Sequence, residues 1–291
     1  MIGLGTNNFG MRIDEPAADA VVRACLDHGI NHFDTADMYG KGKSEEFLGR
    51  ALGTRRDEAI IATKFGVMSG ASPEVVRESV DGCLQRLGTD RIDLMYLHRP
   101  DDKTPIADTL GAFDECIQAG KLIEIACSNF SADQLREADA AATPGTARFV
   151  AVQNHYNLLN RADEAALEAA EKLGIGYLPF FPLASGMLTG KYTRGEAAPE
   201  GTRLAGQPER SAELLNDATY DIVEGLMAWA ADHGHSVLEL AFAWLLSKPG
   251  VPSVIAGATR PEQVAANAAA GSWALTPAEV AEVAAIADGA S

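Results

Sequence analysis

The sequence has little positive charge, few cysteines and no long apolar run. Its 291 residues include 24 Lys and Arg against 41 Asp and Glu, which gives a formal net charge of −17. Such a chain lacks the basic surface that nucleic acids and anionic membranes require. No stretch approaches the roughly 20 apolar residues of a transmembrane helix, and residues 1–5 do not begin a secretory signal. We therefore expect a soluble, cytoplasmic protein that binds neither nucleic acid nor membrane.

The four cysteines offer no pattern of their own. Cys25, Cys83, Cys116 and Cys127 are scattered without the spacing of metal ligands. Most of them stand among apolar neighbours, which is typical of small buried side chains in a reducing compartment. We expect no metal site.

A phosphate-binding loop of the dinucleotide type is also missing. Residues 3–10, GLGTNNFG, match the G-x-G-x-x-G pattern only superficially, because Asn8 stands where the third glycine is required. The acidic residue that should close a following strand is not in the right place either, since Asp34 lies beside a different motif. These absences disfavour an open, doubly wound sheet.

Short apolar runs alternate with longer amphipathic stretches along the whole chain. This alternation predicts parallel strands joined by helices. The expected strands are 2–6, 31–34, 59–64, 92–98, 123–128, 149–153, 175–180 and 252–257. Eight such units predict an α/β fold of the (β/α)8 TIM barrel type, as a single domain over residues 1–291.

Two segments depart from the repeat. Residues 185–216 are rich in Gly, Pro and charge and are too long for a plain connection, which predicts a lid or binding loop. The alternative for this segment is a disordered surface excursion. Residues 276–288 predict an extra C-terminal helix, because Thr276 and Glu279 fit a capping box. Other helix ends are marked by Ser72, by Ser131 with Gln134, by Gly88 and by Gly120.

Polar side chains stand at the ends of five predicted strands, where a buried parallel strand should stay apolar. Successive positions are separated by about one β/α unit. Because the carboxyl ends of barrel strands converge on one face, we expect these residues to share a site. They are Asp34, Lys64, His98, Ser128 with Asn129, and Gln153.

Tyr39, five residues beyond Asp34, completes a possible acid–base group. A phenol with a pKa near 10 is a weak acid at neutral pH, and the ammonium of Lys64 would lower that pKa. Asp34 would keep Lys64 charged, and His98 would hydrogen-bond a substrate oxygen. Taken singly, these residues also fit a turn tyrosine, a core histidine and a structural ion pair.

In this order and spacing, the motifs resemble those of the aldo-keto reductase family over almost the whole chain. The matching segments are GLGT at 3–6, NHFDTADMYG at 31–40, ATK at 62–64, LHRPD at 97–101, CSNF at 127–130 and VQNHYNL at 152–158. The resemblance implies a catalytic tetrad of Asp34, Tyr39, Lys64 and His98, with Tyr39 as general acid. It also implies that Ser128, Asn129 and Gln153 hold the carboxamide of a nicotinamide.

Two further segments complete the resemblance. Residues 180–191, FFPLASGMLTGK, resemble the segment after strand seven, so Phe180 is expected to stack on the nicotinamide and Leu183 to contact the cofactor. Many members have a tyrosine at the position of Phe180. Asn7 and Asn8 replace a region where a large aromatic is common, which predicts a wider substrate pocket. Without the family, Ser128 and Asn129 could instead cap the next helix, and Gln153 could be structural.

Residues 255–267 run from the last strand into a helix and suit a phosphate. Small residues let the backbone approach a ligand, and a helix N-terminus favours anions. Arg260 carries the planar donor fork that suits a 2′-phosphate. The resemblance implies that this segment binds the phosphate of the adenosine, which favours NADP over NAD. The expected binding residues here are Gly257, Thr259, Arg260, Gln263 and Asn267. The alternative is a capping box of Thr259 with Glu262 and a solvated Arg260.

The function expected from these observations is NADPH-dependent reduction of a small-molecule aldehyde or ketone to an alcohol, in a reversible reaction. An NADP-sensing regulatory subunit with little turnover is a second hypothesis, although no appended segment suggests a partner surface. A third is a barrel aldolase or isomerase that uses Lys64 as a base or Schiff-base lysine.

Overall fold

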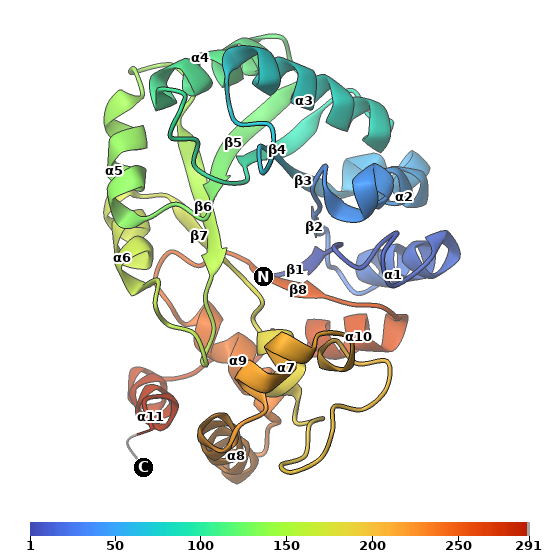
Figure 1. The fold of residues 1–291 in the computed structure, drawn as a ribbon, viewed down its shortest axis with the longest axis vertical. Coiled ribbons are helices and arrows are strands. Elements are labelled where there is room, and N and C mark those ends of the chain that lie inside the picture. The colour runs from blue at the N-terminus through green and yellow to red at the C-terminus, as the bar shows by residue number, and fades with distance from the viewer. Residues whose placement is uncertain (290–291) are drawn as a thin grey trace.

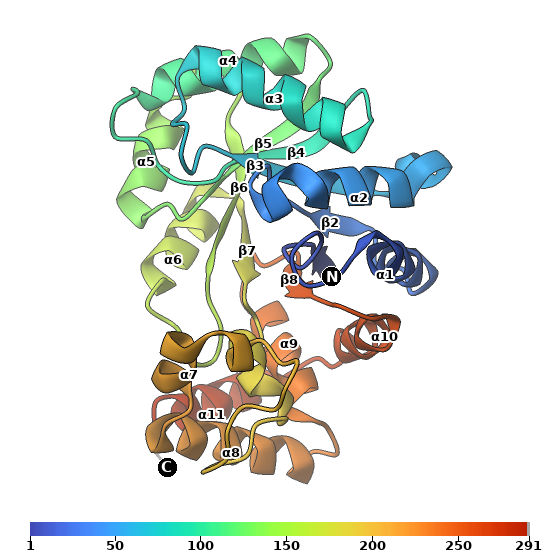
Figure 2. The ribbon, with the colours of Figure 1, turned by 45° about the vertical axis from the view of Figure 1, so that its right-hand side comes forward.

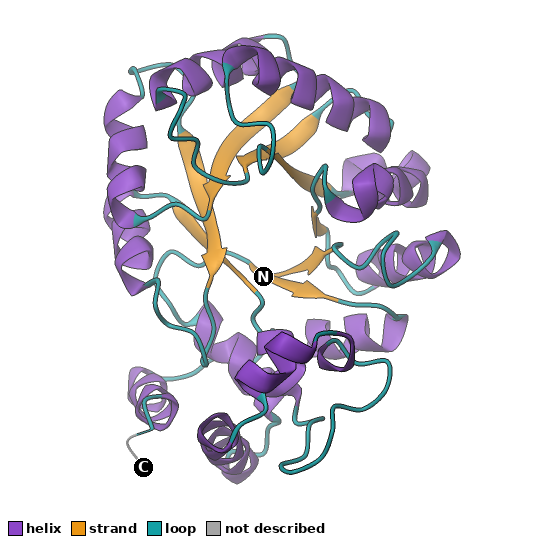
Figure 3. Cartoon of the chain, viewed as in Figure 1, coloured by secondary structure: helices purple, strands orange, loops and turns teal. Residues whose placement is uncertain are grey.

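The computed structural model describes residues 1–289 as eight parallel strands that close into a barrel inside a ring of helices (Figure 1). Figure 3 shows the strands on the inside and the helices around them. The strands are β1 (Ile2–Gly5), β2 (His32–Asp34), β3 (Ile60–Phe65), β4 (Ile92–Leu97), β5 (Leu122–Ser128), β6 (Phe149–His155), β7 (Gly176–Phe180) and β8 (Val254–Gly257). β1 pairs in parallel with β8, which closes the barrel. The predicted (β/α)8 fold is confirmed, with each strand within two residues of its expected bounds.

Helices follow the strands in regular alternation up to β7. The first six are α1 (Glu15–Asp27), α2 (Lys43–Leu52), α3 (Pro73–Leu87), α4 (Ile106–Gln118), α5 (Ala132–Ala141) and α6 (Glu164–Leu173). After β7 come α7 (Pro208–Leu214), α8 (Asp217–Asp232) and α9 (Val237–Leu246), and after β8 come α10 (Pro261–Ala270) and α11 (Pro277–Ala287). The C-terminal helix is confirmed as α11. It packs against α8, a second additional helix that the sequence did not reveal, below the barrel in Figure 2.

The predicted helix ends are present in the structure. The Ser72 side chain accepts a hydrogen bond from the Val75 amide at the start of α3, and Gly88 ends that helix in a left-handed conformation. Reciprocal capping boxes form at the starts of α5 and α11. Each box satisfies amides that the first helical turn leaves without a partner.

Two apolar layers hold the barrel. The larger one lies between the strands and the helices. The smaller one fills the inside of the barrel with alternate side chains of the strands, namely Ala62, Tyr96, Ala126, Ala151, Leu178 and Ile255. Because this inner layer closes the lumen, a ligand can enter only at an end of the barrel.

Within residues 1–289, four short 3-10 segments complete the fold: η1 (Tyr39–Gly42), η2 (Gly53–Glu58), η3 (Ala184–Thr189) and η4 (Leu204–Gly206). The long segment after β7 contains η3, η4 and α7, so it is built of short ordered pieces. Among residues 1–289, no helix combines the length and the apolar character needed to cross a bilayer.

Candidate active site

A cavity of about 690 Å³ lies at the carboxyl end of the strands. Its volume falls within the range of small-molecule and cofactor sites. Every residue that the sequence predicted for the site lines it except Lys64, which lies fully buried beneath. The structure therefore brings the predicted residues together from seven strand ends, from β2 to β8, and residues at the end of β1 line the cavity as well. The boundaries differ slightly from prediction, because His98 follows β4 and Gln153 lies two residues before the end of β6.

Lys64 is the centre of the polar group at the base of the cavity. Its Nζ donates hydrogen bonds to Asp34 Oδ1 at 2.5 Å and to the Thr35 carbonyl oxygen at 2.8 Å. The same atom lies 5.4 Å from the ring centroid of Tyr39 and 5.5 Å from that of Tyr96. An ammonium has three N–H donors. Two of those of Lys64 are used in these hydrogen bonds, and the third belongs to a nitrogen that lies close to both rings.

The protonation of Lys64 and Tyr39 follows from this burial. Burial favours the neutral amine, but Asp34 and Tyr39 outweigh it and raise the pKa of Lys64 above its usual value. For Tyr39, burial is the largest influence and raises the phenol pKa, while Lys64 and Arg203 act to lower it. Lys64 therefore acts on the Tyr39 pKa in the predicted direction, but burial, which the prediction did not include, has the larger effect and the pKa is raised overall. Desolvation of the phenolate exceeds the attraction of the two cations.

His98 faces Tyr39 across the cavity. The two rings meet edge to face with centroids 6.2 Å apart. Burial, assisted by the charges of Lys64 and Arg99, lowers the pKa of His98 to about 3. Its buried Nδ1 has no hydrogen-bond partner among the described residues. A neutral imidazole can donate one N–H and accept at its other nitrogen, so His98 is suited to bind an uncharged oxygen.

Asp34, Gln153, Ser128 and Asn129 form one hydrogen-bonded chain along the wall. Gln153 Nε2 donates to Asp34 Oδ2 at 2.7 Å, and Ser128 Oγ donates to the Gln153 carbonyl oxygen at 2.6 Å. Asn129 Nδ2 donates to Ser128 Oγ and to the His98 carbonyl oxygen at 2.9 Å. The alternative role of Ser128 and Asn129 as a helix cap is wrong, because Ser131 caps α5.

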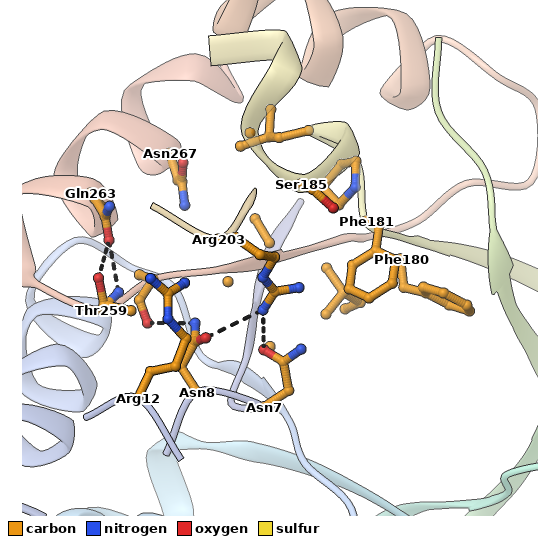
Figure 4. A pocket seen from close by; sticks show the side chains of 18 of the residues that line it. Asn7, Asn8, Arg12, Phe180, Phe181, Ser185, Arg203, Thr259, Gln263 and Asn267 are labelled. Atoms are coloured by element: carbon orange, nitrogen blue, oxygen red, sulfur yellow. Dashed lines mark hydrogen bonds between the residues drawn. The ribbon is translucent and has the colours of Figure 1, made fainter. Parts of the chain in front are cut away.

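Phe180 presents a flat aromatic wall at the end of β7 (Figure 4). His155 stacks on it with ring centroids 5.5 Å apart and an interplanar angle of 13°. Asn160 Nδ2 lies 2.8 Å from His155 Nδ1 and helps to fix that ring. His155 thus occupies one face of Phe180, and Phe181 packs against the same ring in a T-shaped arrangement with centroids 5.2 Å apart.

Arg203, the most buried cation of the cavity wall, was not among the residues that the sequence predicted for the site. It reaches the cavity from the long segment after β7, with Nη2 at 3.2 Å from Asn7 Oδ1 and 3.3 Å from Asn8 Oδ1 (Figure 4). Its guanidinium carbon lies 5.3 Å from the ring centroid of Phe181. Arg203 thus occupies part of the space expected to be open beside Asn7 and Asn8. No sequence signal distinguished it from other loop arginines.

Arg203 belongs to a cluster of four cations. Arg12 Nη2 donates to the Gly201 carbonyl oxygen at 2.6 Å, which ties the loop before α1 to the segment that carries Arg203. Burial and the charges of Arg12, Arg203 and Arg260 lower the pKa of Lys191. Like charges that lie near one another repel, so an anion bound among these four side chains would relieve the repulsion.

At the start of α10, the predicted residues adopt an arrangement that neither sequence interpretation described. Gln263 Oε1 accepts hydrogen bonds from the amide and the hydroxyl of Thr259 at 2.7 and 3.1 Å (Figure 4). The alternative capping box of Thr259 with Glu262 is wrong, because Arg260 is the N-cap residue and makes no side-chain cap. The Arg260 side chain is 70% exposed at the rim of the cavity.

The distribution of charge sets the cavity apart from the rest of the protein. Within residues 1–289, most Lys and Arg side chains have a carboxylate within 4.0 Å. The cavity wall collects cations without one: Arg12, Arg99, Lys191 and Arg203. An acidic chain thus keeps unpaired positive charge where a ligand enters. No group of three potential metal ligands occurs in the described part of the chain.

Comparison with known proteins agrees with this geometry. The family model of the "Aldo/keto reductase family" matches residues 1–288. The chain is 36% identical over 273 residues to a "Probable voltage-gated potassium channel subunit beta" of Oryza sativa subsp. japonica, covering 89% of this chain and 83% of that protein. It is 34% identical over 280 residues to "L-glyceraldehyde 3-phosphate reductase" of Escherichia coli O157:H7, covering 90% and 80%.

A further relative bears the family's own name. The "Aldo-keto reductase YhdN" of Bacillus subtilis (strain 168) is 35% identical over 289 residues, covering 94% of this chain and 86% of that protein. The match of the family model over nearly the whole chain, together with the closed barrel and the group around Lys64, leads to one conclusion. The chain belongs to the aldo/keto reductase family of oxidoreductases.

Proposed function

We propose that this protein reduces aldehyde or ketone groups of small molecules with NADPH and that Tyr39 is the proton donor. The observation that carries the proposal is the position of Tyr39 between charged Lys64 and neutral His98 at the base of a ligand-sized cavity. A relative reduces a phosphorylated aldehyde according to its name, which supports carbonyl reduction in this chain.

The residues present fit a nicotinamide dinucleotide phosphate. Arg12, Lys191 and Arg203 would hold the central phosphates, because they are clustered cations without carboxylate partners. Exposed Arg260, beside the N-terminus of α10, would hold the 2′-phosphate. Asn129 and Gln153 would bind the carboxamide, and Phe180 would support the ring. The bound nicotinamide supplies the hydride that reaches the carbonyl carbon.

The remaining steps belong to side chains of this protein. Neutral His98 donates an N–H to the carbonyl oxygen and orients it toward Tyr39. Tyr39 gives its phenolic proton to the oxygen as negative charge develops there. Lys64, which is fully buried, then stabilises the phenolate at close range. Asp34 keeps Lys64 protonated and correctly placed through the 2.5 Å ion pair.

Replacing Tyr39 by Phe tests this assignment. We expect Tyr39→Phe to lower kcat for carbonyl reduction by roughly 10²- to 10⁴-fold, the usual contribution of a general acid. The variant keeps the ring, so the affinity for NADPH should stay within about twofold. The measurement is NADPH oxidation at 340 nm with a panel of aldehydes and ketones, together with NADPH fluorescence titration. Turnover by the variant at the wild-type rate would refute the role of Tyr39.

A regulatory role remains the second candidate, because two plant relatives are named as probable channel subunits. In that role the protein would bind NADPH but reduce carbonyls very slowly. Multiple-turnover measurements with substrate and NADPH in excess over the protein separate the two functions, since a reductase releases its alcohol and turns over again. The third hypothesis, an aldolase or isomerase, predicts turnover of a sugar phosphate without consumption of NADPH.

A further inference from the structure

A separate cation, Arg99, lines the cavity away from the cluster of Arg12, Lys191, Arg203 and Arg260. It follows β4, which stands across the barrel from β8 in the closed strand order. Its side chain is exposed and has neither a carboxylate nor a hydrogen-bond acceptor as partner among residues 1–289. Its positive charge acts together with burial and Lys64 to lower the pKa of His98. Arg99 therefore lies beside the place where the carbonyl would react.

The backbone on both sides of Arg99 is fixed. On one side, Asn129 Nδ2 binds the His98 carbonyl oxygen at 2.9 Å. On the other side, the Asp101 carboxylate accepts from the Ala71 amide at 2.8 Å, from the Lys103 amide at 3.0 Å and from Thr104 Oγ1 at 2.8 Å. These bonds join the loop after β4 to the loop after β3. A free guanidinium thus projects from a segment that is held at both ends.

This arrangement differs from that of an ordinary surface arginine of the protein. Arg136 on α5 is also exposed, but Asp133 binds it at 2.6 Å, one turn away on the same helix. Asp101 and Asp102 lie within three residues of Arg99, yet Asp101 is engaged by backbone and hydroxyl donors, and Asp102 does not come within 4.0 Å of the guanidinium. The structure keeps this cation available beside the reacting atoms.

We propose that Arg99 binds an anionic group of the substrate, so the substrate is an aldehyde or ketone that carries a carboxylate or a phosphate. This inference rests on the proposed reductase function and adds the class of substrate. A planar guanidinium can bind either anion with two parallel hydrogen bonds. The other cations are assigned to the cofactor, which leaves Arg99 as the one cavity cation on the side of His98 in the described chain.

Matched pairs of substrates test the proposal. The carboxylate pair is 4-formylbenzoate and its methyl ester, and the phosphate pair is glycolaldehyde phosphate and glycolaldehyde. For each pair, the ratio of kcat/KM for the anion to that for the neutral compound is measured in wild type, Arg99→Met, Arg99→Lys and Arg136→Met. Methionine retains the length and the apolar stem but removes the charge, and Arg136→Met controls for loss of one positive charge from the protein.

We expect wild type to prefer the anion in at least one pair. Arg99→Met should reduce that preference roughly tenfold to a hundredfold, the range for a hydrogen bond to a charged group, mainly through KM. Arg99→Lys should restore part of it, and Arg136→Met should retain the wild-type ratio. The pair that shows the effect identifies the anion.

Two results would overturn the inference. One is a wild-type protein that reduces the neutral compounds and shows no preference for either anion, in which case the proposed reductase function stands and the substrate class does not. The other is a ratio in Arg99→Met equal to that of wild type. If wild type reduces none of the four compounds and no other carbonyl compound with NADPH, the proposed reductase function is refuted, and this inference is refuted as well.

Discussion

His98 shows how one buried side chain links the chemistry of the site to the stability of the protein. Its pKa is lowered to about 3, chiefly by burial, with Lys64 and Arg99 adding to the shift. The imidazole thus stays neutral in the folded protein throughout the pH range of most enzymes, whereas it titrates near 6.5 when the chain unfolds. Catalysis by a neutral imidazole is consequently independent of the titration of His98 at neutral pH.

Stability should depend on pH because of this difference. Below pH 6.5 the unfolded chain binds a proton at His98 that the folded protein does not bind, so the folded state loses stability as the pH falls from 6.5 toward 3. Between pH 7 and pH 5 this group should remove about 2 kcal/mol from the free energy of unfolding. Urea denaturation of wild type and His98→Gln at both pH values measures the effect.

The comparison of the two proteins isolates His98 from the other histidines. The difference in unfolding free energy between pH 7 and pH 5 should be larger in wild type than in His98→Gln by about 2 kcal/mol. Glutamine cannot be protonated in this range, and it keeps a hydrogen-bonding side chain. Equal pH dependence in the two proteins would show that His98 is not held neutral by its surroundings.

The residues at the base of the cavity were predictable from the sequence, and those on its rim were not. Asp34, Lys64 and His98 stand at successive strand ends, so the geometry of a barrel brings them together in any member of the fold. Arg203 lies far along the chain in a loop with no periodicity, and its place depends on tertiary contacts with Asn7 and Asn8. The net direction of the Tyr39 pKa shift was also unpredictable, because it depends on the depth of burial, which outweighs the predicted effect of Lys64.

At the scale of elements, the turn that carries Tyr39 is anchored by a buried ion pair. α2 follows this turn directly, and its Glu45 is fully buried, with Oε2 accepting from Arg86 Nε of α3 at 2.5 Å and Oε1 accepting from Thr63 Oγ1 at 2.6 Å. Gly42 must remain a glycine here, because its φ is +90° and an added Cβ would lie 2.7 Å from Arg86 Cδ. The pair thus joins α2, α3 and β3 behind the proposed acid.

Loss of Arg86 should leave an unpaired buried charge. We expect Arg86→Met to lower the free energy of unfolding by about 3–5 kcal/mol, the usual effect of breaking a buried ion pair by removing one partner. The matched control is Arg77→Met on the same helix, whose pair with Glu115 is about half exposed and should contribute less than about 1 kcal/mol. Chemical denaturation at pH 7 compares the three proteins. Similar losses in the two variants would show that the pair of Glu45 with Arg86 contributes no more than an exposed ion pair.

The helices differed in how clearly the sequence predicted them. Capping residues marked the starts of α3, α5 and α11, because a side chain that satisfies the first amides is a local signal. α8 carries a cap at Asn216 as well, but no strand precedes it directly, so the β/α alternation gave no reason to expect it. Its packing against α11 is a long-range contact between two elements outside the repeat.

At the scale of the whole molecule, the cavity is assembled from both ends of the chain. Asn7, Asn8 and Arg12 come from the loop after β1, Arg203 from the segment after β7, and Arg260 from the start of α10. A ligand that bridges these parts binds only the folded protein, so it must raise the free energy of unfolding by mass action. The positions of the cations then determine whether NADPH or NADH raises the free energy of unfolding more.

NADPH should therefore stabilise the protein more than NADH does. At a concentration 100 times its Kd, NADPH should add about 2.7 kcal/mol to the free energy of unfolding, which corresponds to a rise in Tm of roughly 5 °C for a chain of this size. Arg260→Gln should weaken NADPH binding about tenfold, since an ion pair with the 2′-phosphate is lost, and should leave the smaller effect of NADH unchanged. Differential scanning fluorimetry with titration of both dinucleotides measures these shifts. Equal stabilisation of wild type by NADPH and NADH would contradict the assignment of Arg260, because NADH lacks the group that this guanidinium is proposed to bind.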